Sequence, residues 1–316
     1  MRFLLGGLLW VGAIQASVLQ YAPQLGAAGN ITGAAYSSGA AQSGVARLIF
    51  TNGALCSGVA IAPTVVLTAA HCIGGSATGA NAFFTDSGAN SGTFNTASFL
   101  VHPSWTGNPL TQVDLALVFL TSPLASWVSI YDLYSNMDEV GQTYQVAGWG
   151  EQSSFGLPQG SIASAGAGVK VGNNLWDATF APFAPFVPPA PPRDDILVSD
   201  FDDGTAANNG WAVHFPLLNL SNVGVANEAT FAPGDSGGPS FLGGRVAGIT
   251  SFSATFNPPV RGAFGEFNGA TRVSSHLIWI NQNAGTTQVP EPASLGFVGL
   301  ATYLIWAAKR RPNIDS

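Results

Sequence analysis

The sequence of 316 residues has few basic residues, and several of them lie at its two ends. Arg2 is near the start, and Lys309, Arg310 and Arg311 are near the end. Between residues 31 and 285, 6 Lys and Arg stand against 15 Asp and Glu, a balance of -9. Proteins that bind nucleic acid neutralise phosphates with clustered Lys or Arg. The lack of a basic stripe therefore argues against a nucleic-acid partner.

Cysteine is also scarce, because Cys56 and Cys72 are the only two in the chain. More than one intramolecular disulfide is therefore excluded, but the pair alone does not distinguish free thiols from a bridge. Arg2 precedes an apolar run over residues 3–14 and then small residues, a pattern typical of a secretory signal peptide. We assign that signal to residues 1–16. Export to an oxidising compartment favours the bridge.

Helix signals are few, whereas turn residues and β-branched residues recur throughout. This composition predicts a mainly β protein of short strands joined by turns. Strand-like runs cover residues 45–50, 57–62, 65–69 and 115–120, and residues 274–283 favour a short terminal helix. With 47% hydrophobic residues, the chain can bury one full core, so we expect one catalytic unit with processed ends.

Two internal segments differ from their surroundings. Residues 181–192 are rich in proline, which removes backbone donors and excludes a central strand, so they predict an exposed loop. The acidic and Gly/Asn-rich residues 199–210 are expected to extend the same insertion. Its carboxylates could offer oxygen ligands to calcium, but their spacing matches no complete EF-hand. A solvated acidic loop is the better interpretation, and no metal is assigned. The carboxylates in question are Asp200, Asp202 and Asp203.

The C-terminal residues 286–316 form a separate module. Pro290, Glu291 and Pro292 precede an apolar stretch over residues 293–308, which ends at three basic residues. Those sixteen residues are fewer than the roughly 20 of a comfortable transmembrane helix, and the basic end would stay cytoplasmic.

The three parts in this order resemble the PEP-CTERM sorting signal of Gram-negative bacteria. The resemblance implies a membrane anchor that an exosortase-type enzyme processes. The mature protein would then be periplasmic, on the cell surface or extracellular. An ordinary C-terminal anchor is the alternative, and both interpretations require export.

Three further segments carry residues suited to peptide hydrolysis. Ser236 lies in a glycine-rich turn over residues 233–239, where the amides of Gly234 and Ser236 can point into one small space. His71 follows a strand-like run and small residues, and Asp114 begins an apolar run. Hydrolysis by serine needs a base, a group that orients the base, and donors for the oxyanion. The three segments offer one candidate for each part.

These segments resemble the chymotrypsin/trypsin family, with the order His, Asp, Ser preserved. The motifs are Thr68-Ala69-Ala70-His71-Cys72, Asp114-Leu115-Ala116-Leu117 and Gly234-Asp235-Ser236-Gly237-Gly238-Pro239, supported by Cys56-Ser57-Gly58, Ala147-Gly148-Trp149-Gly150 and Ala247-Gly248-Ile249-Thr250-Ser251. The resemblance covers residues 31–283. It implies two six-stranded antiparallel β-barrels with a short C-terminal helix, over a domain at residues 31–285.

The same resemblance assigns roles to individual residues. It implies a catalytic triad of His71, Asp114 and Ser236, with Ser251 supporting the aspartate. It also implies a Cys56–Cys72 bridge beside the histidine. Asp132, Asp138, His102, His214 and His276 have no comparable sequence context.

Activation is a further implication of the resemblance. Residues 17–30 are small and polar and are interpreted as a propeptide. Cleavage after Asn30 would expose Ile31, whose ammonium would pair with Asp235 as in the family's zymogens. The oxyanion loop would remain disordered before that cleavage, because Asp235 would be buried without a partner.

Specificity is inferred by alignment to the family. Thr230 would lie at the base of the primary pocket, where trypsins have aspartate, and Ser253 and Asn268 would line its walls. Glu228 could reach the pocket only if the loop shifts. Small or medium uncharged side chains are therefore expected, rather than Arg or Lys. No cofactor is expected.

Two other functions remain open at this stage. One is a catalytically silent, protease-shaped module that binds partners at the cell surface. The other is an esterase, because the same nucleophile permits other acyl transfers. The main prediction is a serine endopeptidase that acts on protein or peptide substrates.

Overall fold

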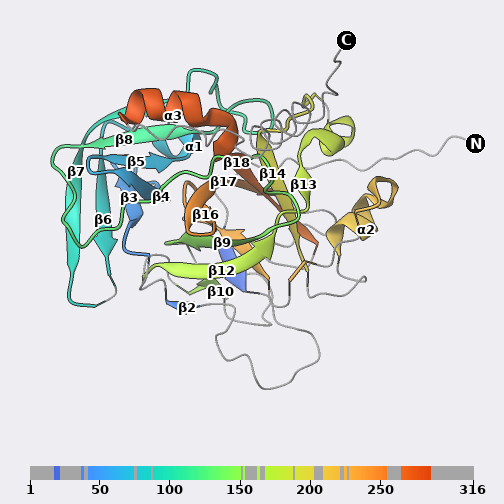
Figure 1. The fold of residues 1–316 in the computed structure, drawn as a ribbon, viewed down its shortest axis with the longest axis horizontal. Coiled ribbons are helices and arrows are strands. Elements are labelled where there is room, and N and C mark those ends of the chain that lie inside the picture. Colours follow the sequence, from blue (N-terminus) through green and yellow to red (C-terminus); the bar gives the residue numbers. More distant parts are fainter. Residues whose placement is uncertain are drawn as a thin grey trace, which may run out of the picture.

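The computed structural model describes residues 18–21, 37–38, 42–74, 77–86, 88–150, 152–153, 162–163, 168–187, 189–202, 209–220, 224–225, 228–254 and 265–285. Their fold is mainly β, as predicted. Figure 1 shows two β units side by side, with a helix near the end of the described chain lying along the first unit.

The first unit is a closed barrel in which the strand order is β3-β4-β5-β8-β7-β6. Its strands are β3 (Val45–Phe50), β4 (Leu55–Ala62), β5 (Val65–Thr68), β6 (Ala80–Thr85), β7 (Ser91–Val101) and β8 (Ala116–Leu120). The four strand-like runs predicted from the sequence correspond to β3, β4, β5 and β8. Their β-branched and aliphatic residues fill the barrel, because closure leaves no other place for the inward side chains.

The second unit is a curled sheet of eight strands in the order β13-β14-β18-β17-β16-β9-β12-β2. Its strands are β2 (Ser37–Ser38), β9 (Thr143–Gly148), β12 (Lys170–Leu175), β13 (Ala178–Thr179), β14 (Ile196–Phe201), β16 (Pro239–Leu242), β17 (Arg245–Ala254) and β18 (Glu266–Arg272). The prediction of two β units is confirmed. The strand count differs, because β13 and β2 add short strands at the two ends of this sheet.

Two short strand pairs complete the described β structure. One pairs β10 (Gln152–Ser153) with β11 (Ile162–Ala163). The other pairs β1 (Val18–Tyr21) with β15 (Ala229–Ala232), so that Gln20 lies opposite Thr230. Strand β1 lies within the predicted propeptide and borders the strand that leads to Ser236.

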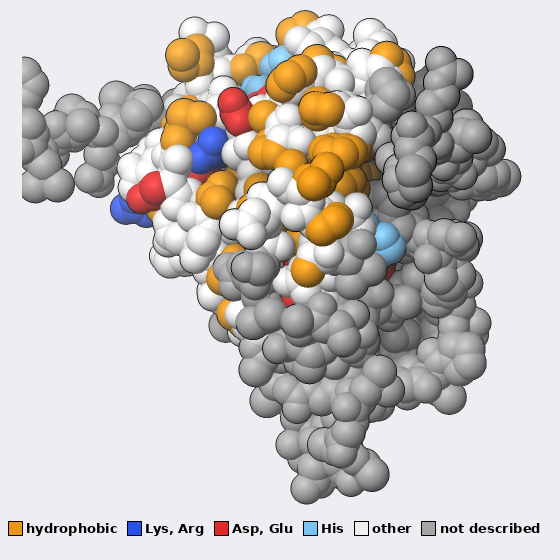
Figure 2. All heavy atoms as spheres, turned by 90° about the vertical axis from the view of Figure 1, so that its right-hand side faces the viewer, with side chains coloured by type: hydrophobic (Ala, Val, Ile, Leu, Met, Phe, Trp, Pro, Cys, Tyr) orange, Lys and Arg blue, Asp and Glu red, His pale blue; other side chains and the backbone are white. Residues whose placement is uncertain are grey.

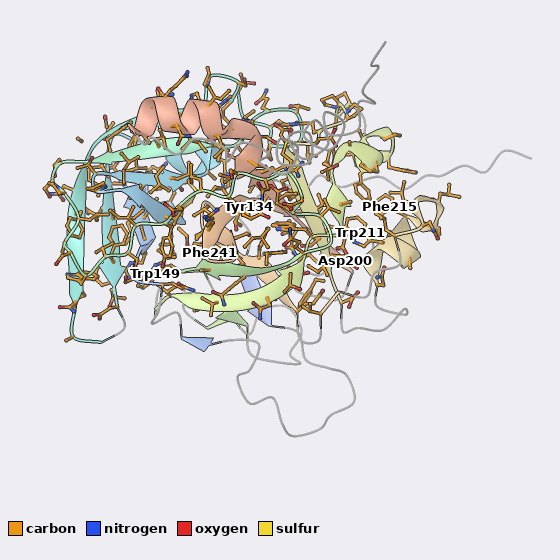
Figure 3. All side chains as sticks on the ribbon, viewed as in Figure 1. Tyr134, Trp149, Asp200, Trp211, Phe215 and Phe241 are labelled. Atoms are coloured by element: carbon orange, nitrogen blue, oxygen red, sulfur yellow. A yellow bond between two sulfur atoms is a disulfide. The ribbon has the colours of Figure 1, made fainter. Side chains whose placement is uncertain are left out.

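The two units share one apolar core. Trp149 follows β9 of the second unit and donates its indole N–H to the carbonyl of Val45 in the first, at 2.9 Å. Its ring also meets Phe83 edge-on, with ring centroids 5.6 Å apart. Phe241 of β16 is buried in the same cluster, and Figure 3 labels both Trp149 and Phe241 between the units. This packing fixes how loops from the two units meet.

The predicted terminal helix is confirmed with a 3-10 start. It consists of η3 (Val273–His276) and α3 (Leu277–Ala284), which packs along β8. Among the described residues, no helix has the length and apolarity needed to cross a membrane. The predicted sorting module at residues 286–316 lies outside the described residues.

The proline-rich insertion is not simply an exposed loop, which corrects the prediction. Its first half is η1 (Ala181–Phe186), followed later by α2 (Gly210–His214) and η2 (Pro216–Leu218). Phe183 is 3% exposed and packs against Trp211 and Phe215, with ring centroids 4.5 and 5.4 Å apart. Proline excludes a strand but does not prevent neighbouring aromatic rings from being buried.

This aromatic cluster covers one side of the second unit. Figure 3 labels Trp211 and Phe215 at that side. Figure 2 views the molecule from there, and hydrophobic side chains gather in the middle of the described part of that face.

The acidic stretch also departs from its prediction. Residues 196–201 form β14, which lies between β13 and β18, so this part is a sheet strand rather than an extension of the insertion. Asp200 and Asp202 are 1% and 0% exposed, and Asp203 lies outside the described residues. The two carboxylates are therefore not part of a solvated loop.

Burial changes how these acids titrate. Together with the charge of Asp177, it raises the pKa of Asp200 to about 9, and together with Asp202 it raises the pKa of Glu228 to about 10. Asp200 and Glu228 are thus protonated at neutral pH, which lowers the cost of burying several acids together.

Candidate active site

His71 is held at the end of a barrel strand by small, buried neighbours and a disulfide. Strand β5 ends at Thr68, and the short helix α1 (Ala70–Ile73) begins after Ala69, which is fully buried. Cys72, which directly follows His71, is bridged to Cys56 of β4, as the resemblance implied. The bridge ties the histidine segment to the barrel wall. Both sulfurs are used in it, so neither is available as a thiolate metal ligand.

Asp114 is buried at 1% exposure and its carboxylate is aimed at His71. One oxygen, Oδ1, accepts the backbone N–H of His71 at 2.8 Å. The other, Oδ2, lies 2.6 Å from His71 Nδ1 and accepts the hydroxyl of Ser251 at 2.5 Å. Thr271 donates to the carbonyl of Asp114 at 3.3 Å. Three hydrogen bonds therefore hold the carboxylate and a fourth holds the backbone of Asp114. The carboxylate selects the imidazole tautomer that carries its proton on Nδ1.

A local irregularity in β17 aims Ser251 at this carboxylate. The pairing of β17 with β18 shifts between Thr250 and Phe252, so Ser251 lies in a bulge. A bulge turns a side chain out of the regular alternation of a strand. The hydroxyl can then reach Asp114, as the resemblance implied.

The surroundings of His71 favour its protonated form. Burial by itself disfavours charge on the ring, but the Asp114 carboxylate acts against this through its charge and its hydrogen bond, and the pKa of His71 is raised above its ordinary value. A base of this kind gains a proton more readily than a free imidazole does.

Ser236 lies in a turn in which some backbone amides are hydrogen-bonded and others are not. The amides of Asp235, Gly237 and Gly238 each donate a backbone hydrogen bond. Among the described residues, the amides of Gly234 and Ser236 have no acceptor. Gly234 has φ +98, a left-handed value that glycine adopts without strain. The two candidate oxyanion donors are therefore the two unpaired amides of this turn.

Ser57 connects this turn to the first barrel, a contact that sequence reasoning missed. Its N–H donates to the carbonyl of Ser236 at 2.7 Å, and its hydroxyl donates to the carbonyl of Gly234 at 2.8 Å. The same hydroxyl accepts the N–H of Trp149 at 2.9 Å. The turn is thus held by a serine from β4, next to the bridged Cys56.

The disulfide lies close to both Ser236 and His71. The sulfur of Cys72 lies 3.9 Å from His71 Nε2 and 3.6 Å from the carbonyl oxygen of Ser236. The Ser236 hydroxyl is buried and has no hydrogen-bond partner among the described residues. The His71–Asp114 half of the predicted triad is therefore hydrogen-bonded, whereas a Ser236–His71 hydrogen bond is not present. Such bonds are often looser without substrate.

Asp235, the predicted partner of the new N-terminus, is fully buried. Its carboxylate accepts the N–H of Gly150 at 2.8 Å. A Cβ atom on Gly148 or Gly150 would come within 2.0 or 2.5 Å of this carboxylate, so both positions need glycine. The buried Lys170 donates to the carbonyl of Gly150, so the backbone of Gly150 connects the Lys170 ammonium with the Asp235 carboxylate. Lys170 was missed from the sequence, and Ile31 lies outside the described residues.

The three predicted pocket residues come together. Thr230 is fully buried and donates to Asn268 Oδ1 at 2.8 Å, and Ser253 lies opposite Asn268 across β17 and β18. Glu266 Oε2 lies 3.5 Å from the Thr230 hydroxyl, a neighbour that the alignment did not suggest. Glu228 instead accepts the backbone N–H groups of Asp202 and Val225.

The segment of β17 beyond Ser251 has one open edge. Pairing with β16 ends at Ile249, whereas pairing with β18 continues to Ala254. Among the described residues, no strand covers the second edge of residues 252–254. Backbone groups there can accept an extended peptide as an added strand.

Known proteins resemble this chain in sequence and in fold. Residues 31–169 match the family model described as Trypsin. A protein of Corynebacterium glutamicum named "Uncharacterized peptidase" is 28% identical over 267 residues, covering 83% of this chain and 73% of its own. A second protein of that species, likewise named only as a peptidase, is 29% identical over 270 residues with the same coverage.

Solved structures share the fold. Neuropsin, a serine protease expressed in the limbic system of mouse brain, gives a TM-score of 0.56 at 20% identity, covering 78% of this chain and 96% of its own. HL collagenase gives the same TM-score and identity, with 79% and 96% covered. The fold is therefore chymotrypsin-like, and the matches together support a trypsin/chymotrypsin-type protease.

Proposed function

We propose that this chain is an exported serine endopeptidase in which Ser236 is the nucleophile, His71 the general base and acid, and Asp114 the residue that orients the base. One observation carries the proposal. The buried Asp114 carboxylate holds both the backbone and the ring of His71, and the sulfur of Cys72 lies close to both His71 Nε2 and the carbonyl oxygen of Ser236.

The chemistry follows from these positions. His71 Nε2 takes the proton of the Ser236 hydroxyl as Oγ attacks the carbonyl carbon of the substrate. The carbonyl oxygen becomes an oxyanion, which the N–H groups of Gly234 and Ser236 stabilise. Asp114 keeps the Nδ1 proton in place and stabilises the imidazolium. His71 then protonates the leaving amine, and a water molecule, activated in the same way, releases the acid from Ser236.

A catalytically silent binding module and an esterase are the competing functions. A fluorescent serine-reactive phosphonate separates the first from an enzyme, because only an activated serine forms the covalent adduct. We expect the mature protein to be labelled. A folded protein that is not labelled would contradict the proposal. Turnover of casein against turnover of a simple ester then separates a peptidase from an esterase.

Specificity is proposed to favour small or medium uncharged residues on the acyl side of the scissile bond. Two contacts support this proposal: Thr230, assigned to the pocket base, donates to Asn268, and Ser253, assigned to a wall, lies opposite Asn268 across β17 and β18. In a peptide library that varies this residue, Ala or Val is expected to give kcat/KM at least about tenfold above Lys, which corresponds to roughly 1.4 kcal/mol. Strict cleavage after Lys or Arg would contradict this and would point to Glu266 as the acidic partner.

Processing at both ends is part of the proposal. Cleavage after Asn30 would detach β1 from the rest of the chain, and β1 pairs with the strand that leads to Ser236. The tail at residues 286–316 would be removed after export by an exosortase-type enzyme at the membrane, in a Gram-negative cell envelope. Intact-mass measurement of active exported protein is expected to give a chain that begins at Ile31 and lacks the tail. Full activity with residues 17–30 retained would contradict the zymogen and the pairing of Ile31 with Asp235.

A further inference from the structure

The loop that carries Asp114 is shaped by hydrogen bonds within the loop itself. It connects β7 to β8 over residues 102–115. Within it, Gln112 Oε1 accepts the N–H groups of Thr106 and Asn108, at 2.6 and 3.1 Å, which closes a turn. At its start, the N–H of His102 bonds the carbonyl of Leu115 at 2.9 Å. These bonds shape the loop, and at its middle Leu110 packs against the aromatic cluster of the second unit.

Arg193, at the end of the proline-rich insertion, adds hydrogen bonds to this apolar contact. Its Nη1 donates to two carbonyls of the loop, those of Pro109 at 3.3 Å and Gln112 at 2.5 Å. Gln112 is two residues before Asp114. The guanidinium is 8% exposed, and the two prolines before it, Pro191 and Pro192, restrict its backbone. A buried cation thus joins the insertion to the segment that carries the candidate orienting residue.

The remaining donors of the guanidinium are also used. Nε and Nη2 donate to the two carboxylate oxygens of Asp195, at 2.7 and 2.5 Å. The carbonyl of Asp195 accepts the N–H of Arg272, next to Thr271, whose hydroxyl holds the Asp114 carbonyl. The position of Arg193 is therefore set by the same sheet that supports Asp114 from the other side.

The Asp195 carboxylate that pairs with Arg193 also faces two histidines. Besides Arg193, the titratable groups that face Asp195 are His276, with Nε2 3.2 Å from its carboxylate, and His102, whose ring is 5.5 Å from that of His276. Burial of Asp195 opposes its ionisation, but its contacts with His276 and Arg193 hold the pKa of its carboxyl well below the usual range. The Asp195 carboxyl is therefore ionised at neutral pH.

We propose that Arg193 is a positioning residue for Asp114, acting through the loop backbone at Pro109 and Gln112. This inference rests on the proposed function for its catalytic consequence. Only a planar guanidinium can hold a carboxylate with two nitrogens and two carbonyls with the third. A lysine in its place would keep the charge beside Asp195 but could not make all four bonds.

The test compares Arg193→Lys with two matched variants. Because a displacement of about 1 Å at a catalytic group can cost on the order of 100-fold, Arg193→Lys is expected to lower kcat by about 10- to 100-fold with KM within about twofold. Arg245→Lys makes the same exchange at an exposed site and should match wild type. Asp195→Asn removes one of the two side-chain acceptors of the guanidinium while leaving both loop carbonyl bonds in place, so its loss of kcat should be smaller than that of Arg193→Lys.

A second readout does not depend on turnover. In a Ser236→Ala background, NMR titration of His71 is expected to give a lower pKa after the Arg193→Lys exchange than before it, because a displaced Asp114 stabilises the imidazolium less. Wild-type kcat and an unchanged His71 titration in Arg193→Lys would overturn the proposal. An equal loss in Asp195→Asn would also overturn it, since the ion pair would then be what matters. A wild-type protein without labelling or turnover would refute the proposed function alone, and the titration would still test Arg193.

Discussion

Replacing Ser236 with alanine is expected to abolish phosphonate labelling and to lower peptidase turnover by roughly 10⁴- to 10⁶-fold, the cost of losing a triad nucleophile. The rate that remains would come from binding and from the oxyanion donors. The substitution should leave the fold intact, because the Ser236 hydroxyl is buried without a hydrogen-bond partner among the described residues. Its loss therefore removes no hydrogen bond within that part of the chain, and the melting temperature should barely change.

The chain offers a close control for this variant. Ser240 is also fully buried, its hydroxyl likewise has no partner in the described part of the chain, and it lies four residues further along. Ser240→Ala should keep full labelling and turnover. Labelling that persists in Ser236→Ala, or that disappears in Ser240→Ala, would show that Ser236 is not the nucleophile.

Asp114→Asn is expected to have the second largest effect, a fall in kcat of about 10⁴-fold with the substrate still bound. The carboxylate accepts three hydrogen bonds, two from His71 and one from Ser251. An amide has a single acceptor oxygen, and its NH₂ group would face a donor. The imidazole would then be held in the wrong tautomer, with its proton on the nitrogen that must receive the one from Ser236.

The pH dependence of wild type and variant follows from the same contact. Activity of wild type should fall as the pH drops through the raised pKa of His71, because a protonated ring cannot act as a base. In Asp114→Asn the raising effects of the carboxylate are lost and burial remains, so the pKa of His71 should fall below its ordinary value. NMR titration of His71 in the Ser236→Ala background, with and without Asp114→Asn, measures the change.

The same shift has a consequence for stability, with a definite sign. The folded protein binds the His71 proton more tightly than the unfolded chain does. The stability contributed by the His71–Asp114 pair is therefore fully present below the unfolded pKa of about 6.5 and is lost as the pH rises through the folded value.

Asp132→Asn is a suitable control, because Asp132 is an exposed aspartate that the sequence also offered for the orienting role. It should retain wild-type kcat and the wild-type titration of His71. The assignment of Asp114 would fail if Asp132→Asn were the inactive variant.

Much of the site could be predicted because its chemistry lies in short, local patterns. The run before His71 is a strand that ends in small residues, and Asp114 lies just before the barrel strand β8. The hydrogen bonds between His71, Asp114 and Ser251 agree with those expected, and their catalytic roles stay predictions. The recurring turn and β-branched residues were enough for the mainly β class, and the motifs in their order along the chain implied two β units.

Two interpretations failed because burial is a property of the whole fold. Proline content correctly excluded a strand over residues 181–192, but it did not reveal that Phe183 would pack against Trp211 of α2. Similarly, the acidic residues after Ser199 were expected to lie in solvent. Asp200 is instead in a strand paired on both sides, where a raised pKa keeps its carboxyl neutral.

The sequence by itself determined the mainly β class, the pairing of Cys56 with Cys72 and the identity of the candidate triad, because each depends on neighbouring residues or on a resemblance in their order. Only the tertiary structure decided what holds those residues in place. Ser57 contacts Gly234 across 177 residues, and Arg193 reaches Gln112 across 81. Such contacts leave no periodicity or motif in a sequence, since they exist only after the two β units have packed together.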